Sequence, residues 1–405
     1  MYFKLAWRNL WRNKRRSIIT ITSIMFAVIF AVFMRSIQFG SYEVMIRGMV
    51  NMYSGYIQIH QNGYWDDQSL DNTFEYNQNF EDSILQVEGV EGLVPRLESF
   101  ALCATDNLSK GSLVVGVNPE KEHNILKLKE QLHEGEVITV DDNSIMLSEG
   151  LATYFKLGVG DTLVLMGQGY HGMSAAGKYN IKGIVKFRSP ALNESVVIMA
   201  LLNAQWLYSA ENRLTSLIIE KPDNADATEV AANITSYLNN SNYEVMDWQT
   251  MIPELVETIE ADSAGGVMMI LVLYMIITFG IFGTILMMTA ERRYEFGVLI
   301  SIGLQRIQLA FVVLIETVLL GFFGVLSGYV LLYPILWYFN VNPIKLTGEM
   351  QTMMEDMGFE AIMPTSLDPS IAISHALIIL VIAFVLSLYP IFHLRSLKPV
   401  EAMRL

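Results

Sequence analysis

The feature that most constrains this chain of 405 residues is the placement of four long apolar stretches. Each is long enough to cross about 30 Å of hydrocarbon as a helix. They predict an α-helical domain with membrane spans at 17–35, 265–290, 309–339 and 371–392. The connection at 36–264 is far longer than the others. With 52% hydrophobic and only 17% charged residues, the composition fits several spans together with a large aqueous domain.

Charge predicts which side of the membrane each segment occupies. Segments 1–16, 291–308 and 393–405 together hold 12 basic and 3 acidic residues, whereas residues 36–262 hold 13 basic and 32 acidic residues. The positive-inside rule therefore places both termini and the 291–308 segment in the cytoplasm and the large domain outside. The overall net charge of −14 argues against a nucleic-acid-binding role, which depends mostly on Lys and Arg.

The first sixteen residues predict a cytoplasmic amphipathic helix that lies in the membrane surface. Phe3, Trp7 and Trp11 recur on one face, while Lys4 and Arg8 recur on another. The apolar stretch that follows lacks a small-residue cleavage site, so we expect a retained anchor as the first span.

The 36–264 block predicts a mixed α/β extracytoplasmic domain inserted after the first span. The end at 250–264 has no Gly or Pro break except Pro253 and predicts a helical stalk continuous with the second span, and 36–52 is expected to extend the first span in the same way. Short apolar or alternating runs predict strands at 56–60, 113–117, 145–147, 162–166, 179–187, 196–199 and 217–220. Helical patterns fall at 148–156, 201–209 and 226–239. Residues 340–370 predict a second, shorter outer loop.

Catalytic and metal-binding chemistry has little support in the sequence. Gly172–Lys178 fits the G-x-x-x-x-G-K phosphate loop, but Tyr179 follows where Ser or Thr is required. We therefore interpret this stretch as a hairpin loop between the strands at 162–166 and 179–187. The six histidines show no metal-ligand spacing, and the single Cys103 excludes an internal disulfide framework. We expect neither a catalytic site nor a metal site.

The third predicted span carries one acid, Glu316, well inside its apolar run. Intramembrane acids are functional candidates by default, but a proton pathway needs a series of such groups. We therefore expect Glu316 to form a hydrogen bond inside a helix bundle. Gly321, Gly324 and Gly328 follow it at spacings that predict a small-residue face for close helix packing.

The 291–308 segment predicts a short amphipathic helix between two spans. Phe296, Leu299 and Ile300 are its apolar residues, and Gly303 is suited to end the helix. Such a helix on the membrane face is a natural docking element for a soluble partner, although an ordinary connecting loop is the alternative.

The segment from Glu291 to Gly303 resembles the coupling helix of one family, the FtsX-like permeases of ABC transporters with a MacB-like outer domain. Residues 5–17 are similar to its amphipathic N-terminus, and residues 390–404 to its closing motif. Residues 116–120 and 157–162 are similar to its MacB-like core domain. The order of these motifs along nearly the whole chain carries the resemblance.

The resemblance implies a permease subunit without enzymatic activity of its own. It implies a separate LolD-like ATPase that binds ATP and Mg²⁺, and a second permease copy or paralogue. This chain itself is then expected to bind no cofactor. Among family members, the size of the outer domain most resembles the LolC/LolE type, which implies lipoprotein extraction from the bacterial inner membrane towards a LolA-like periplasmic chaperone. MacB-like export of peptides or drugs and FtsX-like transmembrane signalling remain alternatives.

The resemblance also assigns residues. The ATPase-docking residues are expected to be Glu291, Arg292, Arg293, Glu295, Phe296, Gly297 and Gly303. A glycine-rich loop bearing Tyr170, His171 and Met173 is expected to contact the chaperone, with a plain turn as the alternative.

A substrate cavity is expected where apolar side chains recur at helical spacing along the first two spans. Methionine supplies a flexible lining suited to acyl chains. The candidate lining residues are Met25, Phe26, Ile29, Phe33, Met268, Met275 and Phe279. Contact with bulk lipid or packing within the bundle is the alternative for each.

Overall fold

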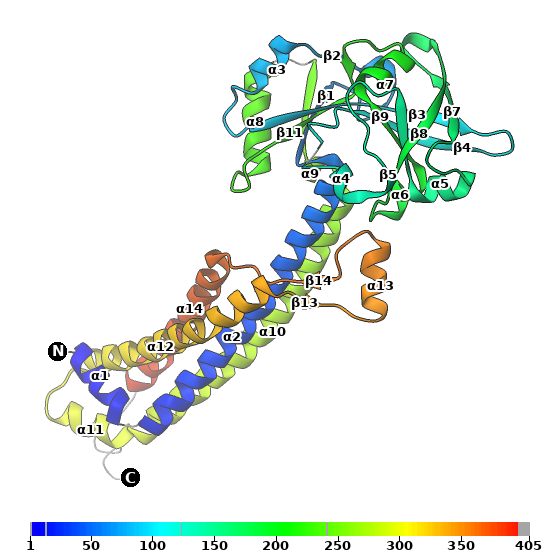
Figure 1. Cartoon of the computed structure of the whole chain (residues 1–405). Helices are drawn as coiled ribbons and strands as arrows, with labels where there is room; N and C mark the ends of the chain where they lie inside the picture. Colours follow the sequence, from blue (N-terminus) through cyan, green and yellow to red (C-terminus); the bar gives the residue numbers. More distant parts are fainter. Residues whose placement is uncertain (1, 13, 123, 240–241, 396–405) are drawn as a thin grey trace. The chain divides into compact units, whose positions relative to one another are not determined.

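The computed structural model describes residues 2–12, 14–122, 124–239 and 242–395. The chain forms two compact units, which Figure 1 shows with their helices and strands labelled. The helical unit comprises Met1–Glu43, Thr258–Lys345 and Ile362–Leu405. The α/β unit comprises Val44–Glu257 and Leu346–Ala361, so part of the 340–370 segment belongs to it.

Long helices dominate the helical unit. Its elements are α1 (Tyr2–Arg12), α2 (Lys14–Met49), α10 (Pro253–Glu291), α11 (Arg293–Ser301), α12 (Arg306–Val341), β13 (Ile344–Lys345), β14 (Ile362–Met363) and α14 (Pro369–Arg395). Helices α2, α10, α12 and α14 are long and apolar enough to cross a membrane. With 36 residues, α2 is about 54 Å long, well beyond ~30 Å of hydrocarbon. Helices α2 and α10 both continue into the α/β unit, as expected for stalks.

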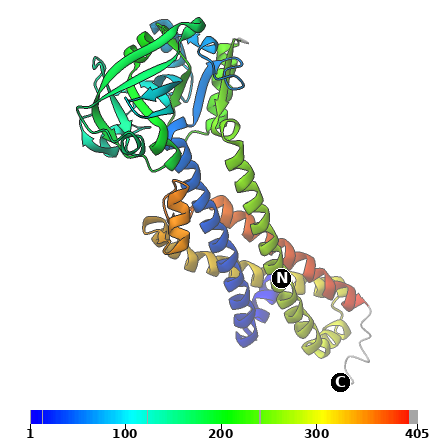
Figure 2. The ribbon, with the colours of Figure 1, turned by 90° about the vertical axis from the view of Figure 1, so that its right-hand side faces the viewer.

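The core of the helical unit lies between its four long helices. Buried side chains from α2, α10, α12 and α14 form one cluster that includes Val28, Ile277, Leu332 and Ile379. Helices α12 and α14 lie side by side in this unit (Figure 2).

The three glycines predicted to form a packing face on α12 lie where this helix approaches α2 and α14. A Cβ at Gly324 would come within 2.5 Å of Ile24 Cγ2 on α2, and one at Gly328 within 3.0 Å of the Met25 carbonyl oxygen. A Cβ at Gly321 would lie 3.3 Å from the Cβ of Ala383 on α14. These three glycines therefore let α12 approach two neighbouring helices closely.

The α/β unit is a closed barrel with a sheet extension and peripheral helices. Its elements are η1 (Val50–Ser54), β1 (Ile57–Gln61), η2 (Leu70–Asn72), β2 (Phe74–Glu75), α3 (Gln78–Ile84), β3 (Gly92–Ala104), β4 (Ser109–Val117), α4 (Leu128–Gln131), β5 (Leu132–Gly135), β6 (Ser144–Ser148), α5 (Glu149–Phe155), β7 (Thr162–Gln168), η3 (Tyr170–Gly172), β8 (Ser174–Val185), α6 (Pro190–Ser195), β9 (Val196–Ala200), α7 (Leu201–Leu207), β10 (Arg213–Leu214), β11 (Ser216–Glu220), α8 (Ala227–Leu238), β12 (Tyr243–Asp247), α9 (Trp248–Met251) and α13 (Glu349–Asp356).

Strand β7 closes the barrel because it pairs with both β3 and β8. The closed order is β3-β4-β9-β6-β8-β7, in which β4–β9 and β6–β8 are parallel. Alternate residues of these strands point inward, among them Cys103, Leu165 and Ile181, all of them buried. Strands β11, β1 and β12 extend the sheet from β3, and α8 packs against β12.

All seven predicted strands and all three predicted helices of this unit are confirmed, within a few residues at their ends. The longest strand of the unit, β3, has no counterpart among the predictions. Pro95, Arg96 and Glu98 interrupt its apolar pattern, yet Arg96 and Glu98 have partners inside the fold, as described below. The predicted hairpin between β7 and β8 is also confirmed.

Candidate functional site

Helix α11 joins two of the long helices and is seated by one aromatic side chain. Phe296 is only 4% exposed and packs against Leu309, Ala310 and Val313 of α12. Gly303, with φ +104°, ends the helix through hydrogen bonds from the Gly303 and Leu304 amides to the carbonyls of Ile300 and Leu299. This is the glycine-terminated helix end expected from the sequence.

The exposed face of α11 differs from the face that the sequence predicted. Tyr294 and Leu299 of α11 are 56% and 40% exposed, and Ile302, directly after the helix, is 77% exposed. Phe296, by contrast, points into the helical unit and packs on α12, and its expected role in docking stays a prediction. The amphipathic pattern could not separate Phe296 from Leu299, because a helix with apolar residues on two sides needs a neighbour to decide which side is buried.

The other predicted docking residues are divided in the same way. Exposed are Glu291, Glu295 and Gly303, and buried are Arg292 and Gly297. The side chain of Arg293 lies outside the described part of the structure. Two ion pairs connect the α11 region to the start of the chain: Arg12 with Glu295, and Arg16 Nη1 with Glu291 at 2.7 Å. The glutamates of both pairs are well exposed, so neither pair contributes much stability.

A buried ion pair lies directly behind α11. Arg292 is the one residue between α10 and α11, and its Nη1 donates to Glu316 Oε2 of α12 at 2.6 Å. Arg292 is 3% exposed and Glu316 only 1%. The expectation that Glu316 forms a hydrogen bond within a bundle is therefore confirmed. Its partner was not foreseen, because Arg292 was assigned to the docking surface.

The residues of the predicted substrate cavity are not alike. On α10, Met268, Met275 and Phe279 are between 59% and 71% exposed and lie on the side away from the core cluster. On α2, Phe26 is 52% exposed, but Ile29 and Phe33 pack against the core cluster. Met25 is half-buried, and its carbonyl faces Gly328. The core of the helical unit thus takes up part of the predicted lining on α2.

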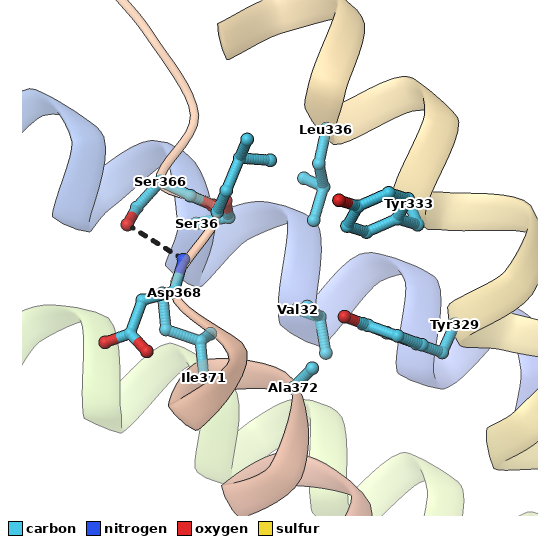
Figure 3. A pocket seen from close by; sticks show the side chains of 10 residues that line it. Val32, Ser36, Tyr329, Tyr333, Leu336, Ser366, Asp368, Ile371 and Ala372 are labelled. Atoms are coloured by element: carbon cyan, nitrogen blue, oxygen red, sulfur yellow. Dashed lines mark hydrogen bonds between the residues drawn. The ribbon is translucent and has the colours of Figure 1, made fainter.

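A small pocket opens between α2, α12 and the beginning of α14 (Figure 3). Val32 and Ser36 line it from α2, and the hydroxyl groups of Tyr329 and Tyr333 face it from α12. Its volume is about 10 Å³, room for a single water molecule at most. This pocket is far too small to hold an acyl chain.

The predicted chaperone loop is shorter than expected. Ser174–Gly177 belongs to strand β8 and pairs with β7, and the side chain of Ala175 lies in the barrel core. The connection is therefore Gly169–Met173, and residues Ser174–Lys178 of the phosphate-loop pattern lie on a strand. Tyr170 stacks under the Arg213 guanidinium at 4.5 Å, whereas the side chains of His171 and Met173 are exposed.

A buried polar cluster in the α/β unit escaped the sequence analysis. Arg96 of β3 donates to both carboxylate oxygens of Glu122, at 2.5 and 2.9 Å, and to the Tyr53 carbonyl of η1 at 2.6 Å. Arg96 and Glu122 are both almost fully buried. Glu98 lies 3.6 Å from Arg96 Nη1, and burial raises the pKa of its carboxyl against the attraction of Arg96. No sequence motif marks this cluster.

Among the described residues, no group of three or more His, Cys, Asp or Glu side chains is placed to hold a metal ion. The site that the structure assembles around α11 is a joint between helices, held by Phe296 on α12 and by the Arg292–Glu316 pair.

Two known families match this chain. Residues 17–237 match the MacB-like periplasmic core domain, and residues 267–399 match the FtsX-like permease C-terminal region. Two relatives are lipoprotein-releasing system transmembrane proteins LolC, from Xylella fastidiosa (strain 9a5c) and from Neisseria meningitidis serogroup B. Each is 22% identical to this chain over 78% of its length, and the match covers 78% and 79% of the relatives, respectively.

Among solved structures, the periplasmic region of MacB from Actinobacillus actinomycetemcomitans is 14% identical over 54% of this chain, with a TM-score of 0.38. The first family match alone covers more than half of the chain. The chain therefore belongs to the FtsX-like ABC transporter permeases that carry a MacB-like periplasmic core domain.

Proposed function

We propose that this chain is a permease subunit that couples ATP hydrolysis in a partner subunit to the extraction of lipoproteins from a bacterial inner membrane. The helical unit lies in that membrane, with the termini and α11 on the cytoplasmic side. The α/β unit follows the first span on the periplasmic side. The basic residues of the short segments and the acidic block between them support this orientation.

The proposal of an ATPase partner rests on the exposed apolar residues of α11. Tyr294, Leu299 and Ile302 are presented to solvent while Phe296 holds the helix on α12. An apolar face at the end of a cytoplasmic segment fits a groove on a LolD-like ATPase, which binds the ATP and Mg²⁺. The permease itself contributes motion: α2 and α10 carry it from the spans to the periplasmic unit.

The lipoprotein assignment is supported by the LolC-named relatives, which match both units. The exposed stripe of Met268, Met275 and Phe279 on α10 supplies an apolar surface for lipid anchors. The described pocket within one chain holds about 10 Å³, so we place the cavity between two permease chains, identical or paralogous. His171 and Met173 are the exposed residues available to a LolA-like chaperone.

A photo-cross-linking experiment tests the substrate. Cross-linkers at Met268 and Met275 are expected to capture a lipoprotein without ATP and to release it when ATP is added to the complex. A cross-linker at Leu331, which is 53% exposed and lies on α12, is the control. Capture of a soluble peptide would favour export, and equal capture at all three positions would mean that the α10 stripe only meets bulk lipid.

A second experiment tests the ATPase. Leu299→Ser combined with Ile302→Ser is expected to abolish co-purification of the ATPase while leaving the permease in the membrane. Leu202→Ser, at a similarly exposed site of the α/β unit, is the control. Normal co-purification of the double variant would exclude this face as the docking surface.

A further inference from the structure

Three buried polar atoms without a hydrogen-bond partner belong to one group of side chains behind α11. They are Glu316 Oε1, Arg292 Nε and Arg16 Nη2, as judged within the described part of the chain. Arg16 and Glu316 also attract each other electrostatically. A buried carboxylate oxygen beside a buried, unused guanidinium N–H is an unusual combination, because each unpaired group carries a desolvation cost.

The three residues come from three different parts of the helical unit. Arg292 is the hinge between α10 and α11, with φ −92° and ψ 9°, outside the helical conformation of its neighbours. Arg16 lies in the first turn of α2, and Glu316 lies in the third turn of α12. Any rotation of α11 about its hinge therefore moves the Arg292 side chain relative to Glu316.

A carboxylate buried to this degree is costly to leave without a cation. Breaking a buried ion pair by removing one partner is strongly destabilising, because the remaining charge stays uncompensated. Arg16 is the available replacement: its Nη1 binds Glu291, which is well exposed, while its Nη2 remains unused inside the unit. The Arg16–Glu291 pair is easily given up, since an exposed acceptor can be solvated by water instead.

We propose that Glu316 is a shared acceptor that passes from Arg292 to Arg16 when α11 is displaced, so that movement of α11 is transmitted to α2 and α12. Arg292, Arg16 and Glu316 are positioning residues in this scheme, which rests on the proposed role of α11 in docking an ATPase. The exchange keeps the buried carboxylate paired in both arrangements. It gives the joint two discrete states, as coupled motion requires.

The exchange predicts a specific pattern in thermal unfolding of the purified full-length permease. Arg292→Gln alone is expected to lower the unfolding midpoint slightly, because Arg16 then binds Glu316. Arg16→Gln alone is also expected to have a small effect. The double variant is expected to lose several times more than the sum of the two, because Glu316 then has neither arginine and is attracted only by the exposed Arg12, which is paired with Glu295.

A rescue variant separates charge from packing. Adding Glu316→Gln to the double variant is expected to recover most of the lost stability, since the uncompensated charge is gone. The matched control is the exposed pair of Arg12 and Glu295. The effects of Arg12→Gln and Glu295→Gln on the unfolding midpoint should be additive. The proposed exchange would be overturned if the midpoint losses of Arg292→Gln and Arg16→Gln were additive. It would also be overturned if Arg292→Gln alone lowered the midpoint as much as the double variant.

Measurement of ATP hydrolysis distinguishes a coupling role of these residues from a purely structural one. With the cognate ATPase bound, Arg16→Gln is expected to leave basal ATP hydrolysis and complex formation unchanged but to lose most of the substrate-stimulated hydrolysis. Unchanged stimulation would contradict the transmission role. If no ATPase binds the wild-type chain at all, the proposed function fails, while the unfolding pattern still decides whether the exchange exists.

Discussion

Both units bury an arginine–glutamate pair, but the two pairs differ in completeness. In the α/β unit, Arg96 uses all three guanidinium nitrogens, and both oxygens of Glu122 are engaged. In the helical unit, Arg292 reaches one oxygen of Glu316 through Nη1 at 2.6 Å and the Asn9 carbonyl through Nη2 at 3.5 Å, which leaves its Nε and the second oxygen of Glu316 without a partner among the described residues. A complete bidentate pair has one favourable geometry, whereas an incomplete pair can change partners.

The position of each pair fits this difference. Arg96 ties η1, where the chain leaves α2, to the barrel strand β3, and its guanidinium lies 4.9 Å above the Tyr53 ring. A stalk can only move a domain to which it is firmly attached. Arg292 lies instead at the break between α10 and α11, where the proposed exchange needs a geometry that can change.

The largest expected effect tests the complete pair. Arg96→Met should lower the free energy of unfolding of the α/β unit by about 3–5 kcal/mol, because Glu122 is left buried and uncompensated. Calorimetry or denaturant unfolding of the full chain measures this loss. Arg96→Met with Glu122→Met is the control, and it should recover much of the stability. A loss below that of Arg292→Gln would break the comparison between the two pairs.

A substitution on α12 tests whether the helical unit, whose buried ion pair is incomplete, is stabilised by close packing between its helices. Gly324→Ala should cost about 1–3 kcal/mol, since the added methyl group would lie 2.5 Å from Ile24 Cγ2. Gly280→Ala on α10 is the matched control, because no atom lies within 4 Å of its Cβ position. Equal unfolding midpoints for the two variants would show that α2 and α12 do not approach each other as described.

The single cysteine reports on the α/β unit separately. Burial inside the barrel raises the pKa of the Cys103 thiol to about 11, so the native protein should react very slowly with thiol reagents at pH 8. Arg96→Met should accelerate the reaction by weakening the barrel, whereas Arg292→Gln should not. Equal acceleration by both variants would mean that the two clusters do not act on separate units.

The smallest expected effect concerns Glu98 and its pH dependence. Because burial raises its pKa in the folded state, folding favours the protonated carboxyl. The stability linked to Glu98 is therefore complete below the ordinary carboxyl pKa and is lost as the pH rises through the folded-state value. Relative to Glu98→Gln, the wild type should gain stability as the pH falls through this range. Parallel pH profiles of unfolding for the two proteins would contradict the assignment.

The sequence by itself determined the features that depend on local pattern. Apolar length identified the four long helices, and alternation identified strands such as β7 and β9. The glycine spacing of α12 and the end of α11 at Gly303 were also readable, because each depends on backbone geometry within a few residues.

Only the tertiary structure decided which polar residues meet. Arg292 and Glu316 are 24 positions apart, and Arg96 and Glu122 are 26 apart, so no local pattern links either pair. The same reason explains Phe296: burial against α12 turned it inward and left Leu299 and Ile302 exposed. Strand β3 was missed because its charged residues are neutralised by partners that only the folded barrel brings together.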